Sequence, residues 1–317
     1  MTQFKFEQQE KDIYITGIED SAKGVERLYI PELIEECPVT GIKEHAFYQN
    51  RDIQEVILPD SVKVIEKYAF AECRKLVRMH MSEAIESIGD YAFYNCHALE
   101  EVDLYANLST MGYGAFKNCS ELKQLRLYTD GVKPLEIGAL IDYNSHEIRV
   151  DLYNEHKELL TKLVFTEFDY DCILQVEARQ FDWVYHGSGN VYRQCITTKG
   201  VDFDKYDSLF ASAVREDWPE TAMTIALGRV LYPYKLEAEY EKTYIEFLKN
   251  HRQAIFELFL KNQDIAQFEK ILDILADEDC LRQWIDAAGQ IHRYEFVSLL
   301  MDYQQQHYGK KQKTFDL

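Results

Sequence analysis

The dipeptide Ala-Phe occurs four times in the first half of the chain, each copy 23 residues after the last. A column of Asn or Cys follows it at the same step, and aliphatic columns flank both. The aligned phenylalanines are Phe47, Phe70, Phe93 and Phe116, and the residues three positions later are Asn50, Cys73, Cys96 and Cys119. A fixed period of this length indicates units stacked in series, because one such unit cannot bury its apolar face alone. The chain is therefore predicted to contain a solenoid.

Each repeat also carries two apolar residues separated by one outward position. These pairs are Val56 and Leu58, Met79 and Met81, Val102 and Leu104, and Leu125 and Leu127. Period-2 alternation predicts a short strand in every repeat, and stacking pairs successive strands in parallel. The Phe and aliphatic columns then form one continuous core. The Asn or Cys column is expected to face inward toward backbone groups, and no further His or Cys joins it in phase to make a metal site.

The stretch "IGDYAFYNCHALEEVDL" resembles the BspA-like class of leucine-rich repeat. Four copies cover about residues 36 to 128, and "VERLYIPELIEECPVTGI" resembles an opening repeat whose strand pair is Leu28 and Ile30. Ile148 and Val150 fall 23 residues after the last pair and predict a degraded closing repeat. The resemblance implies binding to proteins or surfaces.

After the repeats, the pattern of apolar residues changes twice along the chain. A strand is expected in "EIRVDLY", a helix in "NEHKELLTKLV" and a strand in "DCILQVEA". From about Tyr206 helical periodicity dominates, with Asp264 as a helix cap, one helix ending near Pro233, and Phe268 and Leu272 recurring 28 residues later. The prediction is an α+β chain with three parts: 1–152, a leucine-rich repeat solenoid with an N-terminal cap; 153–205, a mixed α/β connector; and 206–317, a helical domain of ankyrin or HEAT type.

The stretch "HGSGNVYRQC", residues 186–195, resembles a site more than any other. A phosphate loop would need a third glycine and a following helix, and a nucleophile elbow would need G-x-S-x-G. The preferred interpretation is a hairpin between "FDWVYH" and "NVYRQCITT", with glycines that tolerate positive φ. The alternative is a thiol-dependent enzyme or small-ligand binder, in which Arg193 lowers the pKa of a thiol. Its residues would be His186, Ser188, Arg193 and Cys195.

The first candidate site is the outward side of the repeat strands, which is the concave face of a solenoid. Tyr and Arg are enriched at the energetic centres of interfaces, and partners of solenoids commonly dock on this face. The predicted partner-binding residues are Arg78, His80, Asp103, Tyr105, Arg126 and Tyr128.

Composition removes several classes of function. The net charge of −20 disfavours nucleic acid, whose binding depends on clustered Lys and Arg. No apolar run reaches the roughly 20 residues that span a bilayer, and the charged start of the chain is unlike a secretory signal. The seven cysteines contain no CxxC pair, which favours free thiols in a reducing compartment. We expect a cytoplasmic bacterial scaffold that is similar to repeat proteins of gut Firmicutes, binds a protein, and has no enzymatic activity, cofactor, metal or membrane partner.

Overall fold

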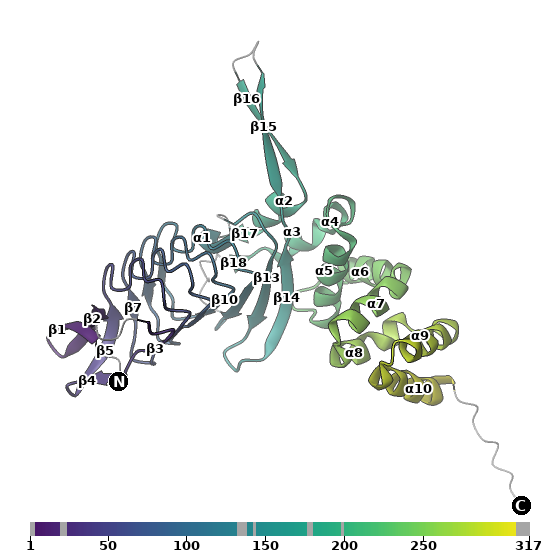
Figure 1. The fold of residues 1–317 in the computed structure, drawn as a ribbon. Coiled ribbons are helices and arrows are strands. Elements are labelled where there is room, and N and C mark those ends of the chain that lie inside the picture. Colours follow the sequence, from purple (N-terminus) through teal and green to yellow (C-terminus); the bar gives the residue numbers. More distant parts are fainter. Residues whose placement is uncertain are drawn as a thin grey trace, which may run out of the picture. The chain divides into compact units, whose positions relative to one another are not determined.

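The computed structural model describes residues 4–19, 24–131, 138–141, 144–175, 180–197 and 200–308. The chain forms two compact units, Met1–Thr221 and Ala222–Leu317. The fold is α+β, with a solenoid of leucine-rich repeats in the first unit and helices in the second, as predicted (Figure 1). The finer division at residues 152 and 205 stays a prediction.

One face of the solenoid is a seven-stranded sheet in the order β14-β13-β12-β10-β8-β6-β3. Its strands are β3 (Arg27–Tyr29), β6 (Glu55–Ile57), β8 (Arg78–His80), β10 (Glu101–Tyr105), β12 (Gln124–Tyr128), β13 (Ile148–Tyr153) and β14 (Leu159–Phe165). All neighbours pair in parallel except β13 and β14. Val102 aligns with Leu125, which confirms the predicted strand pairs. A closing repeat is present, but its predicted register is wrong: Val150 and Leu152 align with Leu125 and Leu127, two residues later than the predicted pair of Ile148 and Val150.

A second sheet, in the order β1-β2-β5-β7-β9-β11, forms another side of the coils. Its strands are β1 (Phe4–Gln9), β2 (Asp12–Ile18), β5 (Cys37–Ile42), β7 (Val64–Ile65), β9 (Ser87–Ile88) and β11 (Thr110–Met111), and β4 (Leu33–Ile34) pairs with β5. The antiparallel β1–β2 hairpin covers the N-terminal end of this sheet. Between the two sheets the four repeat phenylalanines stack, with ring centroids 5.0, 5.4 and 4.8 Å apart. Each contributes about 1.5 to 3 kcal/mol by leaving water.

The thiol column, Cys73, Cys96 and Cys119, lies inside the coils as predicted. Each Sγ donates a hydrogen bond to the carbonyl of the phenylalanine in the preceding repeat, at 3.1, 3.2 and 3.3 Å. Burial raises the pKa of Cys73 and Cys119 to about 12. These thiols therefore act as neutral donors that satisfy buried backbone oxygens.

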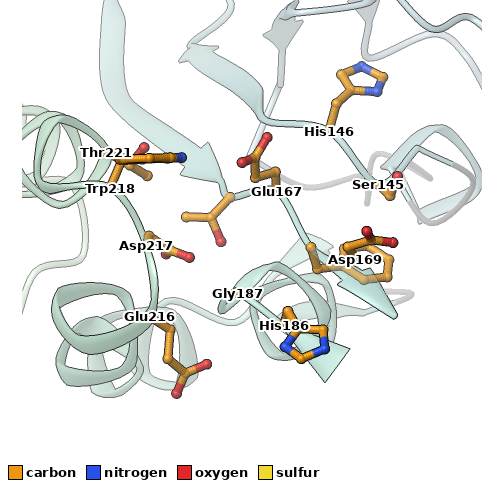
Figure 2. A pocket seen from close by; sticks show the side chains of 12 residues that line it. Ser145, His146, Glu167, Asp169, His186, Gly187, Glu216, Asp217, Trp218 and Thr221 are labelled. Atoms are coloured by element: carbon orange, nitrogen blue, oxygen red, sulfur yellow. The ribbon is translucent and has the colours of Figure 1, made fainter. Parts of the chain in front are cut away.

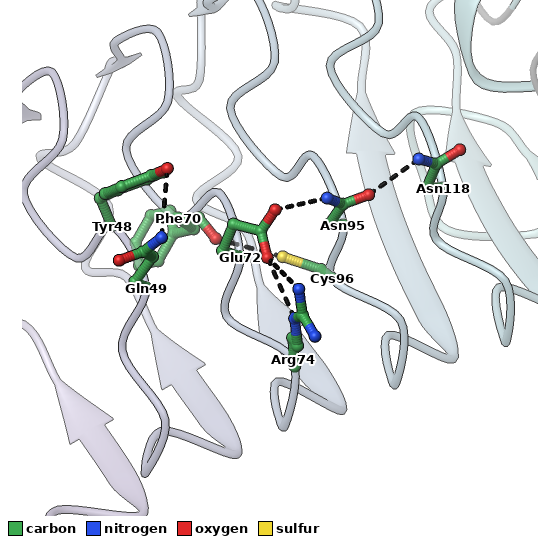
Figure 3. A network of polar contacts seen from close by, with 8 residues as sticks. All are labelled: Tyr48, Gln49, Phe70, Glu72, Arg74, Asn95, Cys96 and Asn118. Carbon is green, nitrogen blue, oxygen red and sulfur yellow. Dashed lines mark hydrogen bonds and ion pairs between the residues drawn. The ribbon is translucent and has the colours of Figure 1, made fainter.

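A second polar column runs outside the coils and was not predicted (Figure 3). Its members Gln49, Glu72, Asn95 and Asn118 all have left-handed backbones, with φ of 57°, 62°, 60° and 64°. The Asn118 amide donates to Asn95 at 2.8 Å, and Asn95 donates to Glu72, which also accepts from Arg74. The hydrogen bonds from Asn95 and Arg74 lower the pKa of Glu72. Side-chain bonds between repeats thus link three of the four residues that adopt this otherwise unfavourable conformation, Glu72, Asn95 and Asn118.

The predicted helix in "NEHKELLTKLV" is wrong, because its second half is strand β14. Residues 154–158 form a turn in which the Asn154 side chain accepts hydrogen bonds from two backbone amides. Thr161, Leu163 and Phe165 then alternate into the core. Antiparallel pairing with β13 supplies the backbone partners of this segment and fixes it as a strand. The Tyr206 hydroxyl caps the outer edge of this strand, accepting from Val164 N at 2.8 Å and donating to Val164 O at 2.9 Å.

Shorter elements complete the first unit. Strands β15 (Asp169–Gln175) and β16 (Gln180–His186) form an antiparallel hairpin, as do β17 (Ile196–Thr197) and β18 (Gly200–Val201). The strand expected in "DCILQVEA" is confirmed as far as Gln175, beyond which it lies outside the described residues. The remaining helices are α1 (Gly138–Ile141), α2 (Gly189–Arg193), α3 (Phe203–Ser208) and α4 (Phe210–Glu216).

The second unit is helical, as the periodicity predicted. Its helices are α5 (Pro219–Leu231), which begins in the first unit, α6 (Ala238–Asn250), α7 (Arg252–Asn262), α8 (Ile265–Leu275), α9 (Glu278–Gln290) and α10 (Tyr294–Tyr308). Asp264 caps α8 through the amide of Gln267, at 3.1 Å. Phe256 stacks on the buried Trp284 with centroids 4.9 Å apart. Among the described helices, none combines the length and apolar character needed to cross a membrane.

Candidate functional site

The strand face consists of the outward side chains of the sheet from β3 to β14. It carries all six residues predicted to bind a partner, on the adjacent strands β8, β10 and β12. Arg78 and His80 are exposed, whereas the members on β10 and β12 are half-buried. The parallel register puts equivalent residues of successive repeats side by side, so the face consists of continuous rows.

Aromatic rings form the most regular row, which we call the tyrosine stack: Tyr105, Tyr128 and Tyr153. The first two centroids lie 4.7 Å apart and the second two 4.9 Å apart, with nearly parallel rings. Burial raises the pKa of all three phenols. Sequence reasoning missed Tyr153, because the 23-residue step placed Val150 opposite Leu127 instead of Leu125.

Charged groups fill the next row. The guanidinium of Arg126 donates to Asp103 at 3.0 Å and to Glu101 at 2.6 Å. Asp151 lies beside Arg126 on β13, and burial raises the pKa of its carboxyl group. The planar guanidinium is thus held in a fixed orientation by two carboxylates, which prepares it for a directional contact.

The N-terminal part of the strand face is organised around Glu55. Its carboxylate lies 2.6 Å from Arg27 Nε and 2.9 Å from His80 Nε2. The hydrogen bond with His80 lowers the pKa of Glu55. His80 is therefore tied to the preceding repeat.

The preferred interpretation of "HGSGNVYRQC", a hairpin turning at its glycines, is wrong. Strand β16 pairs with β15 before it, and residues 189–193 form the short helix α2. Gly187 does adopt a positive φ of 80°, and a Cβ there would lie 2.7 Å from the carbonyl oxygen of Glu167. The positive φ thus ends strand β16, and the missing side chain lets the backbone pass close to residue 167. The sequence alone did not reveal this close approach.

Arg193 is buried at the centre of this segment. The residue is 6% exposed, and its guanidinium donates to five backbone oxygens. These belong to Ile141, Asn144, His146, Thr166 and Gly189, at distances from 2.6 to 3.3 Å. The side chain therefore holds together the backbone at the end of the solenoid, and a buried cation of this kind needs all of its partners.

The other three residues of the alternative site have separate surroundings. His186 is exposed and contacts Asp171 at 3.0 Å. Ser188 is buried, with its amide donating to Asp217 at 2.9 Å and its hydroxyl contacting Asp217 and Thr166. Cys195 is buried, and desolvation raises its pKa to about 12, the opposite of the expected lowering. Burial thus favours the neutral thiol over the thiolate that nucleophilic catalysis needs.

A pocket of about 610 Å³ lies beside this segment (Figure 2), and of the four residues of the predicted alternative site only His186 lines it. Glu167 and Asp169 line one side, and Glu216 and Asp217 line the other. The remaining lining residues are Ser145, His146, Thr166, Phe168, His186, Gly187, Trp218 and Thr221. The two acidic pairs lie about fifty residues apart in the sequence, so no local motif marks them. Within the described ranges, no group of three or more His, Cys, Asp or Glu side chains is placed to hold a metal.

Comparison with known proteins finds similarity to the repeat part of the chain. A family model described as BspA type leucine-rich repeat region matches residues 39–153 in six copies. A comparison with curated proteins matched none of them.

Solved structures with similarity include a leucine-rich repeat protein of T. pallidum, at 25% identity and a TM-score of 0.34, covering 41% of this chain and 74% of that one. Another is a leucine-rich repeat protein of Bacteroides capillosus, at 29% identity and a TM-score of 0.34, covering 39% of this chain and 93% of that one. With its repeat step, parallel register and family match together, the solenoid of this chain is a leucine-rich repeat region of the BspA type.

Proposed function

We propose that this chain is a non-enzymatic scaffold that binds a protein partner on its concave strand face. The observation that carries the proposal is the tyrosine stack beside Arg126, held in place on three successive strands. Leucine-rich repeat proteins are generally binding modules, and repetition gives them extended surfaces for this purpose. The partner is a protein, and affinity purification can identify it.

The chemistry of the face supports this role. Half-buried tyrosines offer a large contact area with few rotatable bonds, and Arg126 offers several fixed donors. Because the side chains are already ordered by stacking and ion pairing, binding them costs less conformational entropy. The face therefore combines aromatic anchors, oriented charge and low ordering cost.

A cytoplasmic location is part of this proposal. The three thiols of the thiol column donate hydrogen bonds inside the core, which requires that they stay reduced. A reducing compartment maintains them in that state.

The test is a quantitative affinity purification from the native cell with the full chain as bait. Tyr128→Ala and Arg126→Ala are compared with wild type and with Tyr113→Ala, which changes a tyrosine that is 56% exposed and lies outside the strand face. We expect the same protein to be lost from both strand-face variants and kept by the control. Equal recovery of every protein by all four baits would contradict the proposal, provided that circular dichroism shows each bait folded.

A further inference from the structure

The pocket beside residues 186–195 has an unbalanced charge. Glu167 and Asp169 on one side form no ion pair with a described basic side chain, and Glu216 has only Arg215, at 3.5 Å. Asp217 is already engaged by Ser188. Three carboxylates therefore border the cavity with their negative charge largely uncompensated, which favours a positively charged occupant.

An aromatic wall is a second and independent feature of the same cavity. Trp218 lines the pocket and is 72% exposed, the largest exposed fraction among the exposed large apolar side chains of the described chain. Phe168 also lines it, but the buried guanidinium of Arg193 already lies 4.7 Å from the centroid of that ring, so Trp218 is the aromatic surface that this wall offers to an occupant. Indole is the best of the aromatic side chains at attracting a cation to its face. Carboxylates together with an open indole match the chemistry of an organic cation and disfavour a bare metal ion.

The size and rigidity of the cavity agree with a small ligand group. Its volume of about 610 Å³ lies in the range typical of small-molecule sites. Gly187 and Thr166 line the pocket beside the buried bonds that Ser188 and Arg193 make, so this part of it is formed before any ligand arrives. A preformed cavity loses little conformational entropy on binding.

We propose that this pocket binds an alkylammonium or guanidinium group. Glu167, Asp169 and Glu216 supply the negative charge, and Trp218 supplies an aromatic surface against which the cation rests. Such a group can belong to a Lys or Arg side chain of a protein or to a free diamine. The pocket uses no residue of the strand face, so this proposal does not rest on the proposed function.

Isothermal titration of the full chain tests the proposal with defined probes. These are Nα-acetyl-lysine amide, Nα-acetyl-arginine amide and 1,4-diaminobutane, with Nα-acetyl-norleucine amide as the neutral control. We expect the cationic probes to bind and the norleucine probe to give no heat. Tighter binding of the capped amino acids would assign the pocket to a protein side chain, and tighter binding of the diamine to a free amine. Absence of binding by all three cations, or equal binding of norleucine, would overturn the proposal.

Matched variants locate the binding. Because close charge pairs lose their attraction when one partner is neutralised, Glu167→Gln combined with Asp169→Asn should weaken binding about tenfold. Trp218→Ala should weaken it about fivefold. Glu155→Gln removes an exposed carboxylate outside the pocket and should leave the affinity unchanged. If the pocket variants bind as wild type does, the cation binds elsewhere and the proposal is wrong.

Discussion

The solenoid and the segment that closes it are stabilised in contrasting ways. In the solenoid the same contacts recur at every repeat, so Phe93 stacks between two other phenylalanines and Cys96 repeats the bond of Cys73. In the closing segment, residues 186–195, the contacts do not recur, and most of those of Arg193 join it to carbonyls 27 to 52 residues away. In a regular solenoid the free energy of folding comes from many similar contacts between repeats, whereas the end of the solenoid depends on a few particular residues.

Replacement of Arg193 gives the largest expected effect and tests this contrast most directly. Arg193→Ala leaves five backbone oxygens without their donor, and we expect the free energy of unfolding of the first unit to fall by about 5 kcal/mol. Urea denaturation followed by circular dichroism measures the loss. Arg215→Ala, at an exposed arginine, is the control and should change stability by less than about 0.5 kcal/mol. A loss below about 1 kcal/mol for Arg193→Ala would mean that the closing segment does not depend on this side chain.

Removal of one stacked ring from the middle of the solenoid is expected to cost somewhat less. Phe93→Ala creates a cavity in the core, with an expected loss of about 4 kcal/mol in the same denaturation experiment. Neighbouring coils can partly collapse into the space. If this variant proves less stable than Arg193→Ala, the contrast between the two regions is reversed.

A single hydroxyl separates the roles of packing and hydrogen bonding at the strand edge. Tyr206→Phe keeps the ring and removes both bonds to Val164, so we expect a loss of about 2 kcal/mol. Hydrogen exchange at the amide of Val164 should accelerate more than exchange at strands β6 and β8. Uniform acceleration across the sheet would show that the hydroxyl stabilises the whole solenoid instead of its edge.

The smallest effect concerns pH and the outer polar column. The pKa of Glu72 is lower in the folded chain than in the unfolded chain, so its contribution to stability is present above the ordinary pKa of a glutamate and disappears as pH falls through the lowered value. Glu72→Gln should therefore cost about 0.5 kcal/mol at pH 7 and almost nothing at low pH. Thermal unfolding at a series of pH values measures this difference. An equal loss at all pH values would show that the charge of Glu72 is not what matters.

The sequence allowed good predictions in the solenoid and poor ones in the segment that closes it. A 23-residue step specified the strands, the stacked phenylalanines and the inward thiols, because each repeat presents the same local pattern to its neighbours. The step also located Arg126 and Tyr128 on the strand face. Tyr153 was missed because the closing repeat adds two residues before its strand pairs, so Tyr128 aligns with a residue 25 positions later.

Prediction failed where partners are distant in sequence. Leu159–Phe165 has a composition compatible with helix or strand, and only its pairing with β13 decides between them. The turn at Gly187 depends on the carbonyl of Glu167, and the pocket depends on four segments, around residues 145, 167, 186 and 217, that no periodicity relates. Local propensity carries no information about such meetings.

The antiparallel strand β14, with Tyr206 on its edge, also governs how this solenoid can change in length. Another coil appended after β14 would have to displace the Tyr206 phenol, which occupies the backbone groups of Val164. New coils can instead be inserted between existing repeats, because both ends of an inserted 23-residue coil would meet neighbours of the same length and pattern. Duplication of an internal unit would extend the thiol column and the strand face together while leaving both ends of the solenoid intact. Insertion of internal repeats is therefore the way in which this solenoid can lengthen. The bonds between Tyr206 and β14 also oppose end-to-end polymerisation through strand pairing at that edge.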